Sequence, residues 1–399
     1  MLSGVRVLEL SLPQTMFAGQ ILADLGADVI AVEPPGGSLG RRMEPFRDDR
    51  IGLERSLTWH ALNRNKRGIT IDVECHDGRD TFERLAASAT VVLEAAPARF
   101  HHLADRGLVH CEVRPFSASG PKSRYAFTDR TIVASTGAPS YTGEGDRAPL
   151  FIPVPQAMME TGGEAAIGVL AALLARDRDD QGQSVEVSMR VAAMMSAFSL
   201  PYFSATPEPR PTRPAGRRLV LGVEIPAFYR CRDGFVQVSV AFGGFGGITK
   251  RMVDWLVRDH GLDAAISGVD WSRFPSDADQ RKDVQRLQAL IGALQQVIGS
   301  LSKSEVGLAA RAHGFFAAPL MDMSDIAAFG QYAERGLWAR QVIDAELSID
   351  APVNFAHFSS CPIEQRLPAP GLSEHTTEVL AEAGFSSQEI RALFAHQVI

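Results

Sequence analysis

The stretch SGVRVLELSLPQTMFAGQILADLGADVIAV, residues 3–32, decides the fold class. Residues 5–10 form a short apolar run that predicts a strand, and residues 28–32 predict a second one. Between them, residues 17–25 carry apolar side chains at helical spacing, and Gly26 follows as the C-terminal cap. Because the crossover is helical, the two strands are expected to be parallel, as in a β-α-β unit.

The same alternation of strand and helix continues along the first third of the chain. Further strands are predicted at residues 68–73, 90–94 and 109–113, with a helix at 77–87. This order indicates an α/β fold with a Rossmann-like, doubly wound parallel sheet. The turn after the first strand, residues 11–15, lacks the GxGxxG pattern of dinucleotide-binding proteins.

Residues 205–218 are rich in Pro and Arg, which is typical of a linker, and the pattern of predicted strands and helices changes after them. Beyond it, a predicted hairpin around residues 227–240 and two predicted helices indicate a smaller α+β domain. The predicted organisation is a large domain at 1–204, a linker at 205–219, a small domain at 220–330, and a return linker with the C-terminal part of the large domain at 331–399.

Composition limits the classes of function. The 399 residues include 40 Lys and Arg against 47 Asp and Glu, a net charge of −7 that argues against nucleic-acid binding. No segment has the length and apolar character of a membrane span, and the N-terminus lacks the pattern of a signal peptide. The four cysteines stand far apart with no CxxC pair, which favours free thiols in a reducing cytoplasm over disulfides or a metal site.

Several blocks of sequence, in order and spread over residues 3–399, carry a family resemblance. They are LSGVRVLEL, ILADLGADVIAVEPPGG, ALNRNKRGITIDV, FSASGP, AAIGVLAALLARDRDDQGQSVEVSM and SEHTTEVLAEAGFSSQEIRALFAHQVI. Together they resemble the family III CoA-transferases, the group that includes formyl-CoA transferase, the carnitine CoA-transferases and an α-methylacyl-CoA racemase. The resemblance implies two domains joined by two long linkers into a ring, with two such rings interlocked as a dimer.

The resemblance also implies a covalent mechanism in which an Asp attacks an acyl-CoA thioester. In the family this Asp stands four residues before a Gly at the start of a long apolar helix, and the matching residue here is Met158. A thioether has no ionisable proton and cannot do this work. Met158 and Met159 are therefore interpreted as apolar filling of the pocket. Glu160 lies two residues on, about 200° around a helix, and is a weak candidate for a displaced catalytic acid.

Positions that contact coenzyme A in the family have also changed. Pro34 stands where an Arg follows the second strand, residues 95–96 are Ala-Ala in place of Asn-Phe, and Glu74 stands in place of a Lys. Coenzyme A is the family's substrate, and these replacements put its binding in doubt. No covalently bound cofactor or metal is expected.

Other residues match the family pattern and are predicted pocket residues. They are Gln14, Arg42, Asn65, Lys66 and Arg67, with Asp129 as a second weak catalytic candidate. For the basic residues, an anion-binding role and a structural role in ion pairs remain equally open.

Three hypotheses follow. In the first, the chain is a non-catalytic subunit that pairs with a related chain carrying the Asp. In the second, it is a homodimer repurposed as a lyase, isomerase or cyclase that does not use coenzyme A. In the third, it is a CoA-transferase that uses Glu160 or Glu164. Whether this chain is itself a catalyst stays open at this point. The first hypothesis, a non-catalytic subunit, is preferred.

Overall fold

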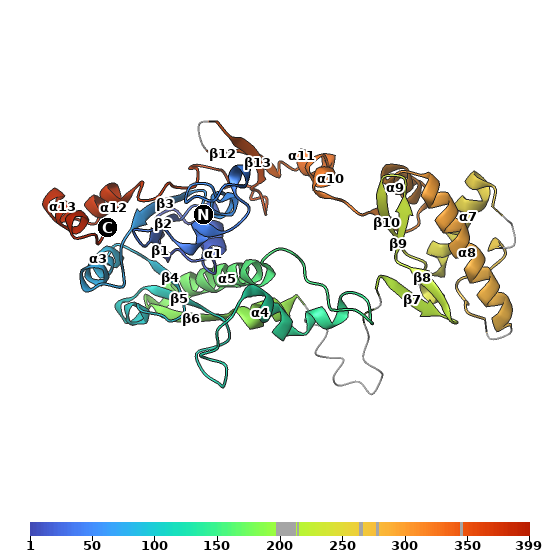
Figure 1. Ribbon diagram of the computed structural model, residues 1–399, viewed down its shortest axis with the longest axis horizontal. Coiled ribbons are helices and arrows are strands. Elements are labelled where there is room, and N and C mark those ends of the chain that lie inside the picture. The colour runs from blue at the N-terminus through green and yellow to red at the C-terminus, as the bar shows by residue number, and fades with distance from the viewer. Residues whose placement is uncertain (197–212, 214, 263–265, 277–278, 344–345) are drawn as a thin grey trace. The chain divides into compact units, whose positions relative to one another are not determined.

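The computed structural model describes residues 1–196, 213, 215–262, 266–276, 279–343 and 346–399. The chain divides into two compact units, which Figure 1 shows with their elements labelled. The larger unit comprises Met1–Pro139, Phe151–Glu208 and Gly330–Ile399, and the smaller comprises Ser140–Leu150 and Pro209–Phe329. Most of the predicted linker at 205–219 lies outside the described residues.

A six-stranded parallel sheet in the order β3-β2-β1-β4-β5-β6 forms the centre of the larger unit. Its strands are β1 (Arg6–Leu10), β2 (Asp28–Glu33), β3 (Lys66–Thr70), β4 (Val91–Ala95), β5 (Val109–Arg114) and β6 (Gln183–Ser188). Val7 on β1 pairs with Val29 on one side and Val91 on the other, which fixes the register at the centre of the sheet. This strand order is that of the Rossmann fold, and the predicted fold class is confirmed. The predicted interlocked dimer remains a prediction.

Helices cover both faces of this sheet. One face carries α1 (Met16–Asp24), α4 (Asp129–Thr136), α5 (Gln156–Asp179) and α6 (Met189–Met195), and these share one apolar core with β1, β4 and β5. The other carries α3 (His76–Ala86) with the C-terminal helices α12 (Thr376–Glu382) and α13 (Ser387–Ala395), which lie together in Figure 1. The chain end therefore completes the core that its first strands begin.

Helix α5 is the long apolar helix expected from the sequence, and it positions the predicted site. It is long and apolar enough to cross a membrane by length and composition alone. Its apolar character has an account within the fold, because Ala165, Val169 and Ala172 are buried in the core beside α1.

The smaller unit has its own core around α7 (Gly246–His260), α8 (Gln280–Ser300) and α9 (Lys303–His313). An antiparallel sheet in the order β11-β10-β9 lies on it, and the β9–β10 pair is the predicted hairpin. These strands are β9 (Phe228–Cys231), β10 (Gly234–Val238) and β11 (Ala317–Pro319), with a separate hairpin of β7 (Arg217–Val220) and β8 (Val223–Pro226).

The remaining described elements are short. They are α2 (Leu57–Leu62), α10 (Met323–Ala327), α11 (Gly330–Glu334), a hairpin of β12 (Trp338–Val342) and β13 (Ser348–Pro352), and the 3-10 turns η1 (Leu39–Arg42), η2 (Arg47–Asp49), η3 (His101–Arg106), η4 (Ala138–Tyr141) and η6 (Gly243–Phe245). The sequence did not predict α2, α4, α9, α10, α11, β7–β8, β11 or β12–β13.

Candidate functional site

The start of α5 is the centre of the predicted site. The residue before the helix, Pro155, provides no side-chain cap. Instead, Asp129 at the start of α4 accepts a hydrogen bond of 2.9 Å from the backbone N–H of Met158, and another from that of Ala157. The carboxylate therefore satisfies two of the unpaired N–H groups that every helix start presents.

Two carboxyl groups near this helix start have shifted acidity. Burial raises the pKa of Asp129, although the backbone N–H groups of Met158 and Ala157 favour its charged form. Burial also raises the pKa of Glu160, a hydrogen bond with Ser196 opposes the rise, and the charge of Asp129 adds to it. The structure thus brings together the two catalytic candidates, Asp129 and Glu160, through α4 and α5.

The two methionines at the helix start face different parts of the core. Met158 is half-buried against the apolar cluster that α4 and α5 share with the sheet. Met159 packs against another cluster that contains Met16 and Trp59. Both side chains lie in apolar surroundings, which is the environment expected of filling residues.

Lys66, a predicted pocket residue on β3, is fully buried. Its ammonium donates hydrogen bonds to Glu9 (2.7 Å), the Met16 carbonyl (2.9 Å) and Asn63 (2.8 Å). Burial lowers the pKa of Lys66, and the Glu9 carboxylate opposes that shift. All three ammonium protons have acceptors inside the fold, so this conformation leaves none for a ligand.

The neighbours of Lys66 are engaged in the same way. The Asn65 amide donates to Asp24 at 2.8 Å and to the Glu364 carbonyl at 3.0 Å. Arg67 is held by Asp28 at 2.8 Å and by Glu378 and Glu382 of α12. Of the two interpretations left open for these residues, the contacts favour structural pairing, because they tie the sheet to the returning C-terminal segment.

Arg42 lies exposed on η1 and donates to the Gly36 carbonyl at 3.2 Å. Its neighbour Arg41, which sequence reasoning missed, is fully buried and forms a bidentate pair with Glu33 at 2.8 and 2.9 Å. The Arg41 guanidinium also lies 3.9 Å from the centre of the Trp59 ring. Both arginines follow the same turn, so only the tertiary contacts with Glu33 and Trp59 distinguish them.

A cavity of about 150 Å³ lies at the carboxyl ends of β1, β2, β3 and β4, where open α/β sheets bind ligands. We call it the β1–β4 crevice. Its apolar lining comes mainly from Leu10, Leu12, Val32, Pro34, Ile71, Val73 and Ala95, and its ionisable lining is Glu33, Asp72, Glu74, Glu94 and Arg99. Ser11 contributes a buried hydroxyl without a hydrogen-bond partner among the described residues.

The charges that line the crevice are mostly negative, as are the phosphates of coenzyme A. Four carboxylates line it against one guanidinium, that of Arg99, and Arg99 is paired with Glu74. Gln14, predicted as a pocket residue, is not among the lining residues, and its buried carbonyl oxygen has no partner in the described part of the chain.

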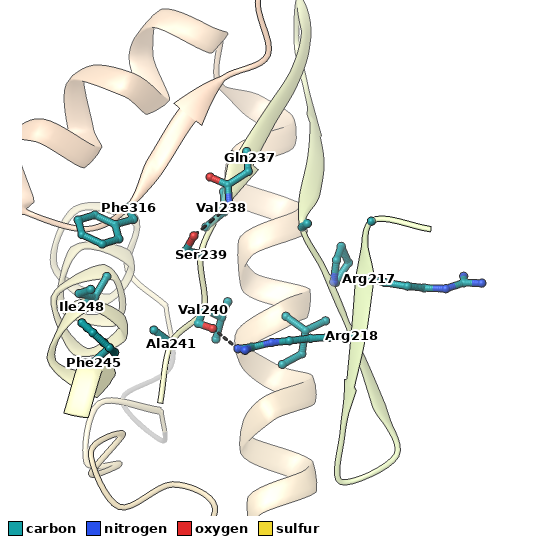
Figure 2. A pocket seen from close by; sticks show the side chains of 14 residues that line it. Arg217, Arg218, Gln237, Val238, Ser239, Val240, Ala241, Phe245, Ile248 and Phe316 are labelled. Atoms are coloured by element: carbon teal, nitrogen blue, oxygen red, sulfur yellow. Dashed lines mark hydrogen bonds between the residues drawn. The ribbon is translucent and has the colours of Figure 1, made fainter. Parts of the chain in front are cut away.

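The smaller unit has a separate cavity of about 570 Å³. Figure 2 shows it between β7, β10 and the start of α7, with Phe245, Ile248 and Phe316 on one side. Two of its polar side chains bond to other lining residues: Arg218 donates to the Val240 carbonyl, and Gln237 donates to Ser239 at 2.9 Å. None of the predicted site residues lines this cavity.

Residues 2–376 match the family described as CoA-transferase family III, so the chain belongs to that family. Among the described residues, no group of His, Cys, Asp and Glu side chains is arranged to hold a metal ion.

Among curated proteins, the chain is 28% identical to succinyl-CoA:(R)-benzylsuccinate CoA-transferase subunit BbsE of Thauera aromatica, over 97% of this chain and 95% of that protein. It is 27% identical to a succinate–glutarate CoA-transferase of Agrobacterium fabrum, over 96% and 95%. A CAIB/BAIF family protein from Brucella suis has a similar structure, with a TM-score of 0.75, 26% identity, and coverage of 96% of this chain and 99% of that one.

Proposed function

We propose that this chain is the non-catalytic subunit of a heteromeric CoA-transferase that acts in acyl-CoA and carboxylic-acid metabolism. The observation that carries the proposal is Met158 at the start of α5, the position where the family resemblance requires a nucleophilic Asp. The Met158 side chain lies half-buried against the apolar core, and the backbone N–H of Met158 donates a hydrogen bond to Asp129. The Asp129 contact holds the start of the helix, and the Met158 side chain supplies no acyl acceptor.

Three further observations support the proposal. A relative that matches nearly the whole chain is named as a subunit of a CoA-transferase. The β1–β4 crevice is lined by acids, and two of the basic residues that match the family pattern, Lys66 and Arg67, are engaged in structural pairs. The partner we propose is a related chain that carries the Asp. We also propose a cytoplasmic location, which the four separated cysteines support.

The proposal is tested by purifying the chain from its native host through an affinity tag and identifying what copurifies. The expected partner is a second family III chain with an Asp at the position that matches Met158. The isolated pair should transfer coenzyme A from succinyl-CoA to a carboxylic acid, and the chain alone should not. Full transfer by the chain alone, as a homodimer, would contradict the proposal.

One observation favours the second hypothesis, a homodimeric enzyme that works without coenzyme A. Asp129 and Glu160 are two carboxyl groups near the helix start with raised pKa values, as general acids and bases often have. This function predicts an activity of the purified chain that is lost in Glu160→Gln. The third hypothesis predicts thioester turnover that is lost in Glu160→Gln or Glu164→Gln.

A further inference from the structure

The β1–β4 crevice differs from a nucleotide site in the sign of its charge. Glu33 is neutralised by the buried Arg41, and Glu94 accepts hydrogen bonds from the backbone N–H groups of Arg99 and Phe100. The two remaining lining acids, Asp72 and Glu74, stand together, since the Asp72 carboxylate accepts a 3.0 Å hydrogen bond from the Glu74 backbone. The crevice therefore keeps negative charge after its internal pairs are counted.

Arg99 is the lining cation that could offset this charge. Its guanidinium is one-third exposed and is bound by the Glu74 carboxylate. A free guanidinium or ammonium strengthens phosphate binding, because its hydrogen bonds to phosphate oxygens are assisted by charge. Arg42 is not among the lining residues, and the Lys66 ammonium is paired with the Glu9 carboxylate.

We infer that Glu74 closes the β1–β4 crevice of this chain to coenzyme A, by placing a carboxylate there and by holding Arg99. The inference deepens the proposed function and rests on it for one consequence: a heteromeric pair would bind one coenzyme A, in the crevice of the partner. The ion pair between Glu74 and Arg99 is partly exposed and adds little to stability. Its effect is on the charge that an anionic ligand meets.

Calorimetric titration of the purified full chain with coenzyme A tests this inference. The wild type should show no binding up to about 1 mM. Glu74→Lys should bind at least about tenfold more tightly, because reversing one charge and releasing Arg99 both attract the phosphates. Glu83→Lys is the matched control: it makes the same charge change at an ion pair with His102 and Arg106 that does not line the crevice, and should behave as the wild type.

Two further measurements separate charge from shape. Adenosine, which carries no phosphate, should bind the wild type and Glu74→Lys equally. Arg99→Ala removes a lining side chain of the crevice but leaves the Glu74 carboxylate, so this variant should still not bind coenzyme A. Micromolar binding by the wild type, no gain in Glu74→Lys, or an equal gain in Glu83→Lys would each overturn the inference.

The failure of this inference is distinct from failure of the proposed function. Wild-type chain that binds coenzyme A but forms no covalent adduct would refute the closed crevice and leave the non-catalytic role standing. Wild-type chain that turns over thioesters would refute the non-catalytic role.

Discussion

Two regions of the larger unit both carry the family pattern, and they differ in what they do with it. Residues 63–67 keep the matching Asn, Lys and Arg side chains, and the structure uses Asn65, Lys66 and Arg67 to bind the sheet to neighbouring segments. The start of α5 keeps the helix but has Met158 at the proposed position of the nucleophile. A residue that matches the family pattern can thus serve the stability of the fold, whereas the replacement at Met158 indicates a change in the reaction.

The largest effect should come from breaking the first region. Lys66→Met leaves the Glu9 carboxylate buried without its partner, which costs about 3–5 kcal/mol of unfolding free energy. Urea unfolding measures it. The matched control is Lys250→Met, since Lys250 forms an exposed pair with Asp254 and should lose about 0.5 kcal/mol or less. A loss in Lys66→Met as small as that expected for Lys250→Met would show that Lys66 has no structural role.

A smaller effect is expected at the helix start. Asp129→Ala removes the acceptor for the N–H groups of Met158 and Ala157, and loss of a helix cap costs about 1 kcal/mol. Asp129→Asn keeps an acceptor oxygen and should be close to the wild type. Thermal unfolding of the two variants side by side checks this, and an Asn variant as unstable as the Ala variant would contradict it.

The pH dependence of stability sharpens the same point. Because the pKa of Asp129 is raised in the folded chain, folding favours its protonated form. The stability that this carboxyl contributes is complete below its unfolded pKa of 3.8 and is lost as the pH rises through the raised value. From about pH 4 to pH 7, wild type should therefore lose stability relative to Asp129→Asn. The opposite trend would show that the helix start stabilises the charged form.

The smallest effect is expected at Met158 itself. Met158→Leu preserves the volume of a half-buried apolar side chain, so stability should change by less than it does in Asp129→Ala. Transfer activity of the purified pair should be unchanged, because the proposal gives the thioether no chemical role. A large loss of activity with stability intact would assign Met158 a part in the reaction.

The sequence predicted the centre of the fold well, because the alternation from β1 through β5 is local and strongly periodic. The strand β3 was placed two residues late, at 68–73 instead of Lys66–Thr70, since Lys66 and Arg67 look like turn residues until Glu9 and Asp28 are seen to pair with them. The helix predicted at 77–87 begins at His76, capped by the Cys75 thiol, which sequence rules do not favour as a cap.

The site was less predictable because its geometry depends on contacts between distant residues. Asp129 was selected from the family pattern, but its contact with the α5 backbone joins residues 29 positions apart. The difference between buried Arg41 and exposed Arg42 depends on Glu33 and Trp59 in the same way. Patterns of residue type carry no information about which of two adjacent arginines turns inward.

The most direct test of the non-catalytic role is intact mass measured after the purified chain is incubated with succinyl-CoA. A nucleophilic carboxylate would become an anhydride and then a thioester of coenzyme A, and either adds mass to the chain. The account predicts an unchanged mass for the wild type, for Glu160→Gln and for Glu164→Gln. A covalent adduct on the wild type would contradict it, and loss of the adduct in one of the variants would identify that Glu as the nucleophile.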